Sequence, residues 1–289
     1  MNLRKRQNMI GWLFILPGAL LIFAFYFYPI IRAFILSLQT GVGHNMTFAG
    51  LYNYKRLFAD GLFKTSLRNT FIYLIQIPIM LFLALILATL LNDDKLKGRP
   101  FFRTAIFLPC ATSLVSYSII FRSLFALDGF VNAILMKLNL ISKPINWLGD
   151  PWTARLIIII ALTWRWTGYN MVFYLSGLQN IGSSIYDAAK IDGAGPVTTF
   201  FKITIPLLKP IILLTAIMST NGTLQLFDEP RNLTNGGPAN ATISLSQYIY
   251  RLAFEYSPNF GYAAAISYVV FIMVAILSLI QIRVGDRRQ

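Results

Sequence analysis

The chain alternates between long apolar runs and short polar segments. Three of the runs are MIGWLFILPGALLIFAFYFYPII (9–31), FIYLIQIPIMLFLALILATLL (71–91) and YAAAISYVVFIMVAILSLIQI (262–282). Each is long enough for an α-helix to cross the hydrocarbon core of a bilayer, which takes roughly 20 residues. The same pattern predicts six membrane-spanning helices, at about 10–31, 70–91, 104–126, 154–178, 207–227 and 261–282.

Composition supports this interpretation and excludes several classes of function. Hydrophobic residues make up 56% of the chain and charged residues only 12%, whereas soluble domains carry about 25% charged residues. The net charge of +14 comes largely from basic residues that flank the spans. Little soluble surface remains to form a basic patch, so nucleic-acid binding is not expected. A single histidine, His44, excludes a histidine-rich metal site, and a single cysteine, Cys110, excludes an internal disulfide. The sequence therefore predicts an all-α membrane protein.

The distribution of Lys and Arg predicts the orientation of the chain. With the N-terminus inside, the inner segments hold thirteen Lys and Arg residues and the outer segments hold nine. Because basic residues are enriched on the cytoplasmic side, this bias favours both termini in the cytoplasm. Trp147 and Trp152, just before the fourth span, fit the outer aromatic belt. No linker or internal repeat interrupts the chain, so one transmembrane domain, 1–289, is expected.

One polar stretch, SSIYDAAKIDGAGPVTTFFKITIPLLKP, separates the fourth and fifth spans. Ser184 and Asp187 have the spacing of a capping box, which predicts a helix from Ile185. Gly193 favours the left-handed conformation that ends a helix, and Pro196 can open a second helix toward the fifth span. Composition alone is also compatible with an ordinary amphipathic connector that rests on the lipid headgroups.

This stretch resembles the cytoplasmic EAA loop of permease subunits in binding-protein-dependent ABC importers. The family pattern is Glu-Ala-Ala, three residues, Gly, nine residues, and Ile-x-Leu-Pro. The chain has Asp187-Ala188-Ala189, Gly193 and Ile203-Thr204-Ile205-Pro206 at the same spacing. The resemblance implies a coupling loop at about 182–206, whose helix docks into a separate ATPase subunit and transmits its closure to the spans. The coupling residues that it implies are Tyr186, Asp187, Ala188, Ala189, Asp192, Gly193 and Ala194.

The chain carries no phosphate-binding loop of its own. Neither G-x-x-x-x-G-K-[ST] nor any Gly-Lys pair occurs in the sequence. The resemblance accordingly places ATP and Mg²⁺ on the partner ATPase, with no cofactor on this chain. It implies a transport subunit and not an enzyme, in the type I ABC importer permease fold of six transmembrane helices with a cytoplasmic coupling helix.

Two further segments are similar to the permeases of carbohydrate importers. They are residues 102–135, with Gly129 and Asn132 after the third span, and residues 224–254, with Thr-Asn-Gly-Gly-Pro at 234–238. The resemblance implies a bacterial cell-membrane complex of two different permeases, two ATPase subunits and an extracytoplasmic sugar-binding protein, with no nucleic acid. The implied substrate is an oligosaccharide or disaccharide. Glycerol phosphate or another polyol, carried by the same family, is the alternative.

Polar side chains inside spans predict the substrate path, because they are costly in lipid and are functional by default. Aromatic faces beside amide or carboxylate groups suit a sugar. The predicted path residues are Trp166, Tyr169, Asn170 and Tyr174 on the fourth span, Asn221, Gln225 and Asp228 around the fifth, and Tyr117 on the third. Interhelical packing is the alternative role for each of them. Arg122 and Arg165 could instead pair with Asp128 or Asp228.

Two rival classes of protein are also compatible with parts of the sequence. An ion-coupled secondary transporter needs an intramembrane carboxylate, for which Asp228 is the candidate. A membrane-embedded enzyme, such as a lipid-linked sugar transferase, needs clustered acids at one interface. Asp93 and Asp94 form an adjacent acidic pair, which a solvated inner loop explains better.

Overall fold

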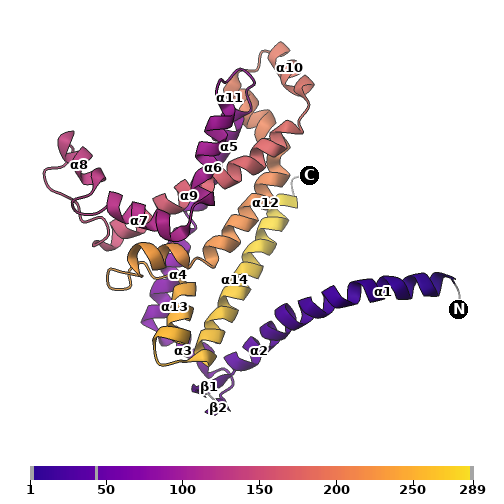
Figure 1. The fold of residues 1–289 in the computed structure, drawn as a ribbon, viewed down its shortest axis with the longest axis vertical. Helices are drawn as coiled ribbons and strands as arrows, with labels where there is room; N and C mark the ends of the chain where they lie inside the picture. The colour runs from indigo at the N-terminus through magenta and orange to yellow at the C-terminus, as the bar shows by residue number, and fades with distance from the viewer. Residues whose placement is uncertain (1–2, 43–44, 287–289) are drawn as a thin grey trace. The chain divides into compact units, whose positions relative to one another are not determined.

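The computed structural model describes residues 3–42 and 45–286 of the chain, so that His44 lies outside the described residues (Figure 1). The chain forms two compact units. The first unit comprises Met1–Asp60 and Ile249–Val269, and the second comprises Gly61–Tyr248 and Val270–Gln289. Nearly all of the described secondary structure is helical.

The first unit contains a long apolar N-terminal helix and a small hairpin. Its elements are α1 (Leu3–Ile22), the π-helical segment η1 (Phe23–Phe27), α2 (Tyr28–Ser37), β1 (Gln39–Val42), β2 (Asn45–Phe48), α3 (Tyr52–Ala59), η4 (Arg251–Glu255) and the start of α14 (Phe260–Asp286). β1 and β2 pair in antiparallel fashion, with Gln39 opposite Phe48. The hydrophobic pattern does not predict these strands. The backbone that leads from α2 into β1 is held by the side chain of Asn53, which is distant in sequence. Asn53 Nδ2 donates to the carbonyls of Ser37 (2.9 Å) and Gln39 (2.8 Å).

The second unit is a helical bundle. Its elements are α4 (Gly61–Tyr73), α5 (Gln76–Leu91), α6 (Arg99–Ala111), α7 (Leu114–Leu124), α8 (Phe130–Lys137), α9 (Pro151–Gln179), α10 (Ser183–Ile191), α11 (Pro196–Thr199), η2 (Phe200–Thr204), α12 (Ile205–Leu224), η3 (Pro230–Thr234), most of α13 (Leu245–Tyr250) and the end of α14. α9 is the central helix and packs against α4, α5, α6 and α12. Asp150 caps its start by accepting from the backbone N–H groups of Trp152 (3.0 Å) and Thr153 (3.1 Å). These hydrogen bonds, the one from Thr153 most of all, lower the pKa of the Asp150 carboxyl.

Five helical stretches are long and apolar enough to cross a membrane, and they confirm five of the six predicted spans. They are Ile10–Ser37, Gly61–Leu91, Pro151–Gln179, Pro196–Leu224 and Phe260–Gly285. The third predicted span, 104–126, corresponds to two helices, α6 and α7, which meet at a bend of 98°. Thr112 is extended at the bend, and its Oγ1 donates to the carbonyl of Pro109 (2.7 Å). Counted as one broken span, α6 and α7 complete the set of six.

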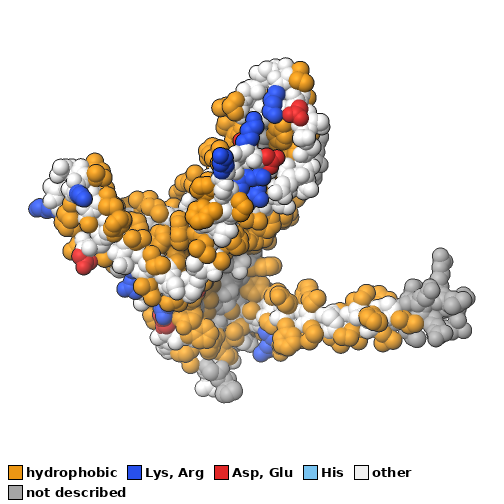
Figure 2. All heavy atoms as spheres, turned by 45° about the horizontal axis from the view of Figure 1, so that its top comes forward, with side chains coloured by type: hydrophobic (Ala, Val, Ile, Leu, Met, Phe, Trp, Pro, Cys, Tyr) orange, Lys and Arg blue, Asp and Glu red, His pale blue; other side chains and the backbone are white. Residues whose placement is uncertain are grey.

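Apolar side chains cover much of the visible surface, as expected for a protein whose solvent is lipid (Figure 2). No part of the most apolar window of Ile10–Ser37 is buried within the chain. Exposed basic side chains include Lys95 and Lys97 in the α5–α6 connection and Lys190 on α10. Under the predicted orientation, these two connections face the cytoplasm, where basic residues are enriched.

Candidate functional site

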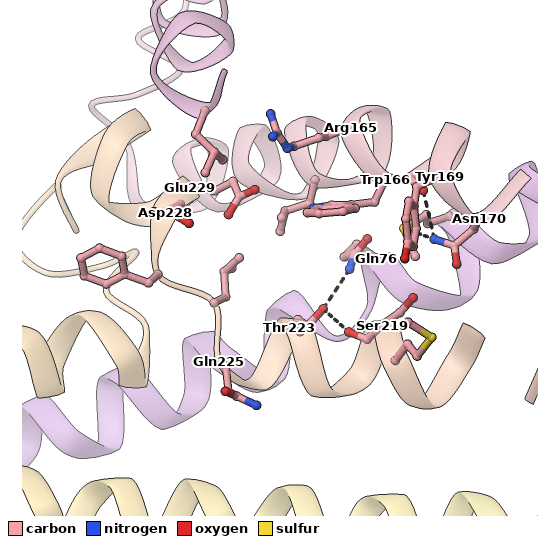
Figure 3. A pocket seen from close by; sticks show the side chains of 17 residues that line it. Gln76, Arg165, Trp166, Tyr169, Asn170, Ser219, Thr223, Gln225, Asp228 and Glu229 are labelled. Carbon is pink, nitrogen blue, oxygen red and sulfur yellow. Dashed lines mark hydrogen bonds between the residues drawn. The ribbon is translucent and has the colours of Figure 1, made fainter. Parts of the chain in front are cut away.

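A cavity of about 440 Å³ lies within the second unit, among α5, α9, α12 and the segment that follows α12 (Figure 3). The polar or aromatic side chains that line it are Gln76, Arg165, Trp166, Tyr169, Asn170, Ser219, Thr223, Gln225, Asp228 and Glu229. Apolar residues such as Met80, Leu162 and Met218 complete the wall. A mostly apolar hollow with a few polar groups is the usual form of a small-molecule site.

Three of the four residues predicted as a stripe on the fourth span lie on the α9 wall of the cavity. Trp166 and Tyr169 line the cavity with their rings at 87° and their centroids 5.7 Å apart. Asn170 lines it too, and its Nδ2 donates to the carbonyl of Trp166 (3.0 Å). Tyr174, one turn further on, is not among the lining residues. It is buried in the apolar cluster of α5, α9 and α12, where its hydroxyl lies 2.8 Å from Thr215 Oγ1.

Of the residues predicted around the fifth span, some line the cavity and one packs against another helix. Gln225 and Asp228 line the cavity, although the Gln225 side chain turns away from Glu229 in Figure 3. Asn221 does not line it, because it faces α14 and its Oδ1 accepts from Ser278 Oγ (3.1 Å). Tyr117 on α7 is buried in an aromatic cluster with Phe121 and Trp164 and is not a lining residue either.

Several lining residues are not among those predicted from the sequence. Gln76 on α5 donates from Nε2 to Thr223 Oγ1 on α12 (3.1 Å), which joins two walls of the cavity. Glu229 is only 3% exposed, and burial raises the pKa of its carboxyl, with the adjacent Asp228 acting in the same direction. The Asp228-Glu229 pair is visible in the sequence as two adjacent acids at the end of an apolar run. Gln76 gives no such signal, because its role depends on a partner 147 positions away.

Arg165 is 5% exposed and lines the cavity, but its hydrogen bonds differ from the predicted ion pairs. Its Nη2 donates to the carbonyls of Thr112 (3.1 Å) and Cys110 (3.5 Å), which lie at the break between α6 and α7. Its guanidinium also lies over the ring of Tyr117, 4.7 Å from the centroid. Among the described residues, Arg165 therefore contacts the broken third span and forms no ion pair with Asp128 or Asp228.

A conservative substitution separates packing from substrate binding at Tyr174. Tyr174→Phe removes the hydroxyl that meets Thr215 and leaves the cavity wall unchanged. We expect the purified protein to lose about 0.6 kcal/mol of stability, the average for such interhelical hydrogen bonds. The substrate concentration at half-maximal uptake should stay the same. A several-fold increase in that concentration would instead place Tyr174 on the substrate path.

The second part of the site is the end of α10. Gly193 has φ +77°, as predicted for a left-handed helix terminus. Its N–H donates to the carbonyl of Lys190 (3.1 Å), and the N–H of Ala194 donates to that of Ala189 (2.9 Å), which together form a Schellman motif. Pro196 is the first residue of α11, also as predicted. The chain therefore makes a fixed bend between α10 and the helix that leads into α12.

The predicted capping box of α10 is wrong. The helix begins at Ser183 after Gly182, with no side-chain cap, because Ser184 already lies inside the first turn. Asp187 instead forms an ion pair with Lys190 (3.1 Å).

The residues predicted to couple the chain to an ATPase differ in exposure. Asp187, Ala188, Asp192 and Gly193 are exposed, Tyr186 and Ala194 are half-buried, and Ala189 is buried. Of Ala188 and Ala189, only Ala188 is therefore open to a partner. Ile191, which the sequence analysis did not select, is 86% exposed at the end of α10.

Comparison with known proteins defines the class. The chain matches the family described as "Binding-protein-dependent transport system inner membrane component" over residues 46–287. The lactose transport system permease protein LacF of Rhizobium radiobacter is 53% identical over 291 residues, which cover 100% of this chain and 98% of LacF. The arabinooligosaccharides transport system permease protein AraP of Bacillus subtilis is 36% identical over 278 residues, which cover 95% of this chain and 88% of AraP.

Among solved structures, the fold is similar to that of a bacterial ABC transporter involved in the import of the acidic polysaccharide alginate. The TM-score is 0.84 at 21% sequence identity, over 98% of this chain and 97% of that one. The spans and cavity thus define a multi-pass membrane transport component with the type I permease fold. The chain belongs to the family of binding-protein-dependent transport system inner membrane components, and it is a permease.

Proposed function

We propose that this permease is a transmembrane subunit of an ATP-driven importer that carries a disaccharide or oligosaccharide across the bacterial cell membrane. The observation that carries the proposal is the α9 wall of the cavity, where Trp166 and Tyr169 present aromatic faces beside the Asn170 amide. Such faces suit sugar rings, and the amide suits their hydroxyl groups. The cavity volume of about 440 Å³ lies in the range of small-molecule sites. LacF and AraP are named for lactose and arabinooligosaccharides, which agrees with a carbohydrate substrate.

The partners follow from the surfaces of the chain and from its relatives. The exposed surface of Asp187, Ala188 and Ile191 on α10 docks into an ATPase subunit, which binds ATP and Mg²⁺. A second, different permease covers apolar helix surface that the chain leaves exposed. An extracytoplasmic sugar-binding protein delivers the substrate. In support, a structure with a TM-score of 0.86 holds an alginate transporter in complex with an alginate pentasaccharide-bound periplasmic protein.

Transport proceeds by alternating access. Docking of the loaded binding protein outside and closure of the ATPase subunits inside turn the cavity outward, and hydrolysis resets it. Both termini and α10 lie in the cytoplasm, in line with the distribution of Lys and Arg. α9 then runs from the outer surface past the cavity and continues through residues 180–182 into α10. One helix therefore links the substrate path to the ATPase contact.

The test of this function is purification and reconstitution. The chain is purified gently from its native membrane, its co-purifying proteins are identified, and the complex is placed in lipid vesicles with the binding protein. We expect an ATPase and a second permease to co-purify, and radiolabelled lactose or an arabinooligosaccharide to accumulate only with ATP. A chain that purifies alone, or uptake that survives without ATP and collapses with an uncoupler, would favour a secondary transporter.

A mutation tests the role of the aromatic wall. Trp166→Ala is expected to lower the uptake rate at subsaturating sugar by about tenfold or more, because an aromatic contact is worth about 1.5 kcal/mol or more. Trp152→Ala is the matched control on the same helix, since Trp152 is 70% exposed and does not line the cavity. Its uptake should stay near that of the unmodified protein. Equal uptake by both variants would remove Trp166 from the substrate path.

A further inference from the structure

Arg165 contacts a break in the third span from the middle of α9. Helix termini leave backbone carbonyls without intrahelical partners, and the end of α6 at Ala111 exposes such groups inside the bundle. Arg165 Nη2 reaches two carbonyls at this end, those of Thr112 (3.1 Å) and Cys110 (3.5 Å). A charged donor to a buried carbonyl forms a stronger hydrogen bond than a neutral donor. Arg165 therefore stabilises the open end of α6.

The same guanidinium also touches the other half of the broken span. It lies over the ring of Tyr117 on α7, 4.7 Å from the centroid, so one side chain of α9 contacts both helices that meet at 98°. One turn further along α9, the backbone at Gly168 lies directly against the backbone of Ile106 and Phe107 on α6. α9 is thus held closely to α6 and linked across the break to α7.

The guanidinium of Arg165 has two further donor atoms. Arg165 Nε and Nη1 are buried and have no hydrogen-bond partner among the described residues. Arg165 lines the cavity together with Asp228 and Glu229, and Figure 3 shows Arg165 and Glu229 at the same end of it. A guanidinium stays charged in proteins, and unused buried donors of this kind are costly. An oxygen-rich molecule in the cavity can supply the missing acceptors.

Arg155, a second buried arginine on α9, has a structural role and serves as a comparison for Arg165. Arg155 is also 5% exposed, but its Nε donates to both Asn69 Oδ1 (3.0 Å) and the carbonyl of Ala241 (2.9 Å). Arg155 does not line the cavity. Its Nε is satisfied by the protein itself, whereas the Nε of Arg165 is not.

We propose that Arg165 is a positioning residue that binds a hydroxyl oxygen of the transported sugar through Nε and Nη1 while its Nη2 holds the break between α6 and α7. This inference rests on the proposed function as a sugar permease. The sugar completes the hydrogen bonds of the guanidinium and so fixes the angle of the third span. α9 leads directly into α10. A sugar bound in the cavity therefore also changes the position of α10, which contacts the ATPase. Asp228 and Glu229 line the same cavity and supply further oxygen atoms for sugar hydroxyl groups.

The experiment uses the full reconstituted complex with Arg165→Lys, Arg165→Gln and the matched control Arg155→Lys. Spin labels at Ala105 on α6 and Ile119 on α7, both exposed on the helix surface, report the bend with and without lactose. In the unmodified complex, lactose should narrow the distribution of label distances. Both Arg165 variants should lose this response and import lactose about tenfold more slowly or worse, because neither lysine nor glutamine reproduces the forked donors of a guanidinium. Arg155→Lys should keep the lactose response.

The outcomes separate the inference from the function on which it rests. Import by the unmodified complex together with an unaltered label response in Arg165→Lys and Arg165→Gln overturns the role of Arg165 alone. Loss of the response in Arg155→Lys as well overturns it too, because the effect would then belong to any buried arginine of α9. Lysine provides the second variant if the glutamine variant does not assemble. Absence of ATP-driven import in the unmodified complex overturns the proposed function itself.

Discussion

Gly193→Pro is expected to uncouple most lactose uptake from ATP hydrolysis while membrane insertion and assembly of the complex persist. Gly193 has φ +77°, whereas proline is fixed near φ −65°. Proline also removes the N–H that donates to the carbonyl of Lys190. The Schellman motif that ends α10 then cannot form, and the fixed bend toward Pro196 is lost. In the proposed mechanism this bend transmits closure of the ATPase to the spans, so hydrolysis should continue with little transport.

The measurement compares ATP hydrolysis and lactose uptake in the same vesicles. Gly195→Ala is the matched control, two residues away, because Gly195 has φ −69° and a Cβ there would meet no atom within 4 Å. The control should transport at the rate of the unmodified complex. The proline variant should take up about tenfold less lactose or worse per ATP hydrolysed, since a strained left-handed position costs about 1–2 kcal/mol even for ordinary residues. Normal coupling in the proline variant would refute the role of this bend.

Local chemistry made the end of α10 predictable from sequence and its start unpredictable. Pro196 has a fixed φ that suits the first turn of a helix, and Gly193 adopts a positive φ without the steric cost that other residues have there. A capping box is weaker, because a helix can begin one or two residues earlier at little cost when its neighbours allow it. α10 does so after Gly182, and Asp187 pairs with Lys190 instead.

In the cavity, periodicity predicted the correct face of α9 and misjudged how far along the helix it lines the cavity. Trp166, Tyr169, Asn170 and Tyr174 share one side, but only the first three line the cavity. Which turn of that side meets open space depends on α5 and α12, and Thr215 fills the space beside Tyr174. Asn221 is a similar case, because Ser278, 57 positions away, decides that it packs against α14. Such partners are not encoded in a local pattern.

The break in the third span was hidden by its composition. The run from 104 to 126 is mostly apolar, and its polar residues, such as Thr112, Ser113 and Arg122, are spread along it, so hydropathy alone favours one helix. Arg165 on another helix stabilises the bend by donating to the carbonyls of Thr112 and Cys110. The arginine in the fourth span has its hydrogen-bond acceptors at the bend in the third span, and the bend has its donor in that arginine. Neither feature can be predicted from its own span alone.

Gly168→Ala is expected to destabilise the bundle at its closest helix contact. The added Cβ would lie 2.7 Å from the carbonyl carbon of Ile106 and press directly on its oxygen. Backbone atoms of α6 cannot rotate away as a side chain would, so α9 and α6 must move apart. Overpacking of this kind costs about 1–3 kcal/mol. Thermal unfolding of the purified complex should show a clear decrease in the midpoint temperature, with less protein accumulating in the membrane.

Gly222→Ala is the control for this prediction. Gly222 also lies within a span, on α12, but a Cβ there meets no atom within 4 Å. Alanine is the better helix former by about 1 kcal/mol, so the midpoint of this variant should be unchanged or higher. Equal midpoints for the two variants would mean that α9 and α6 are not in close contact. The separation of the helices in Gly168→Ala should also pull Arg165 away from Thr112, because both contacts join the same pair of helices. Uptake should therefore fall further than the loss of folded protein explains.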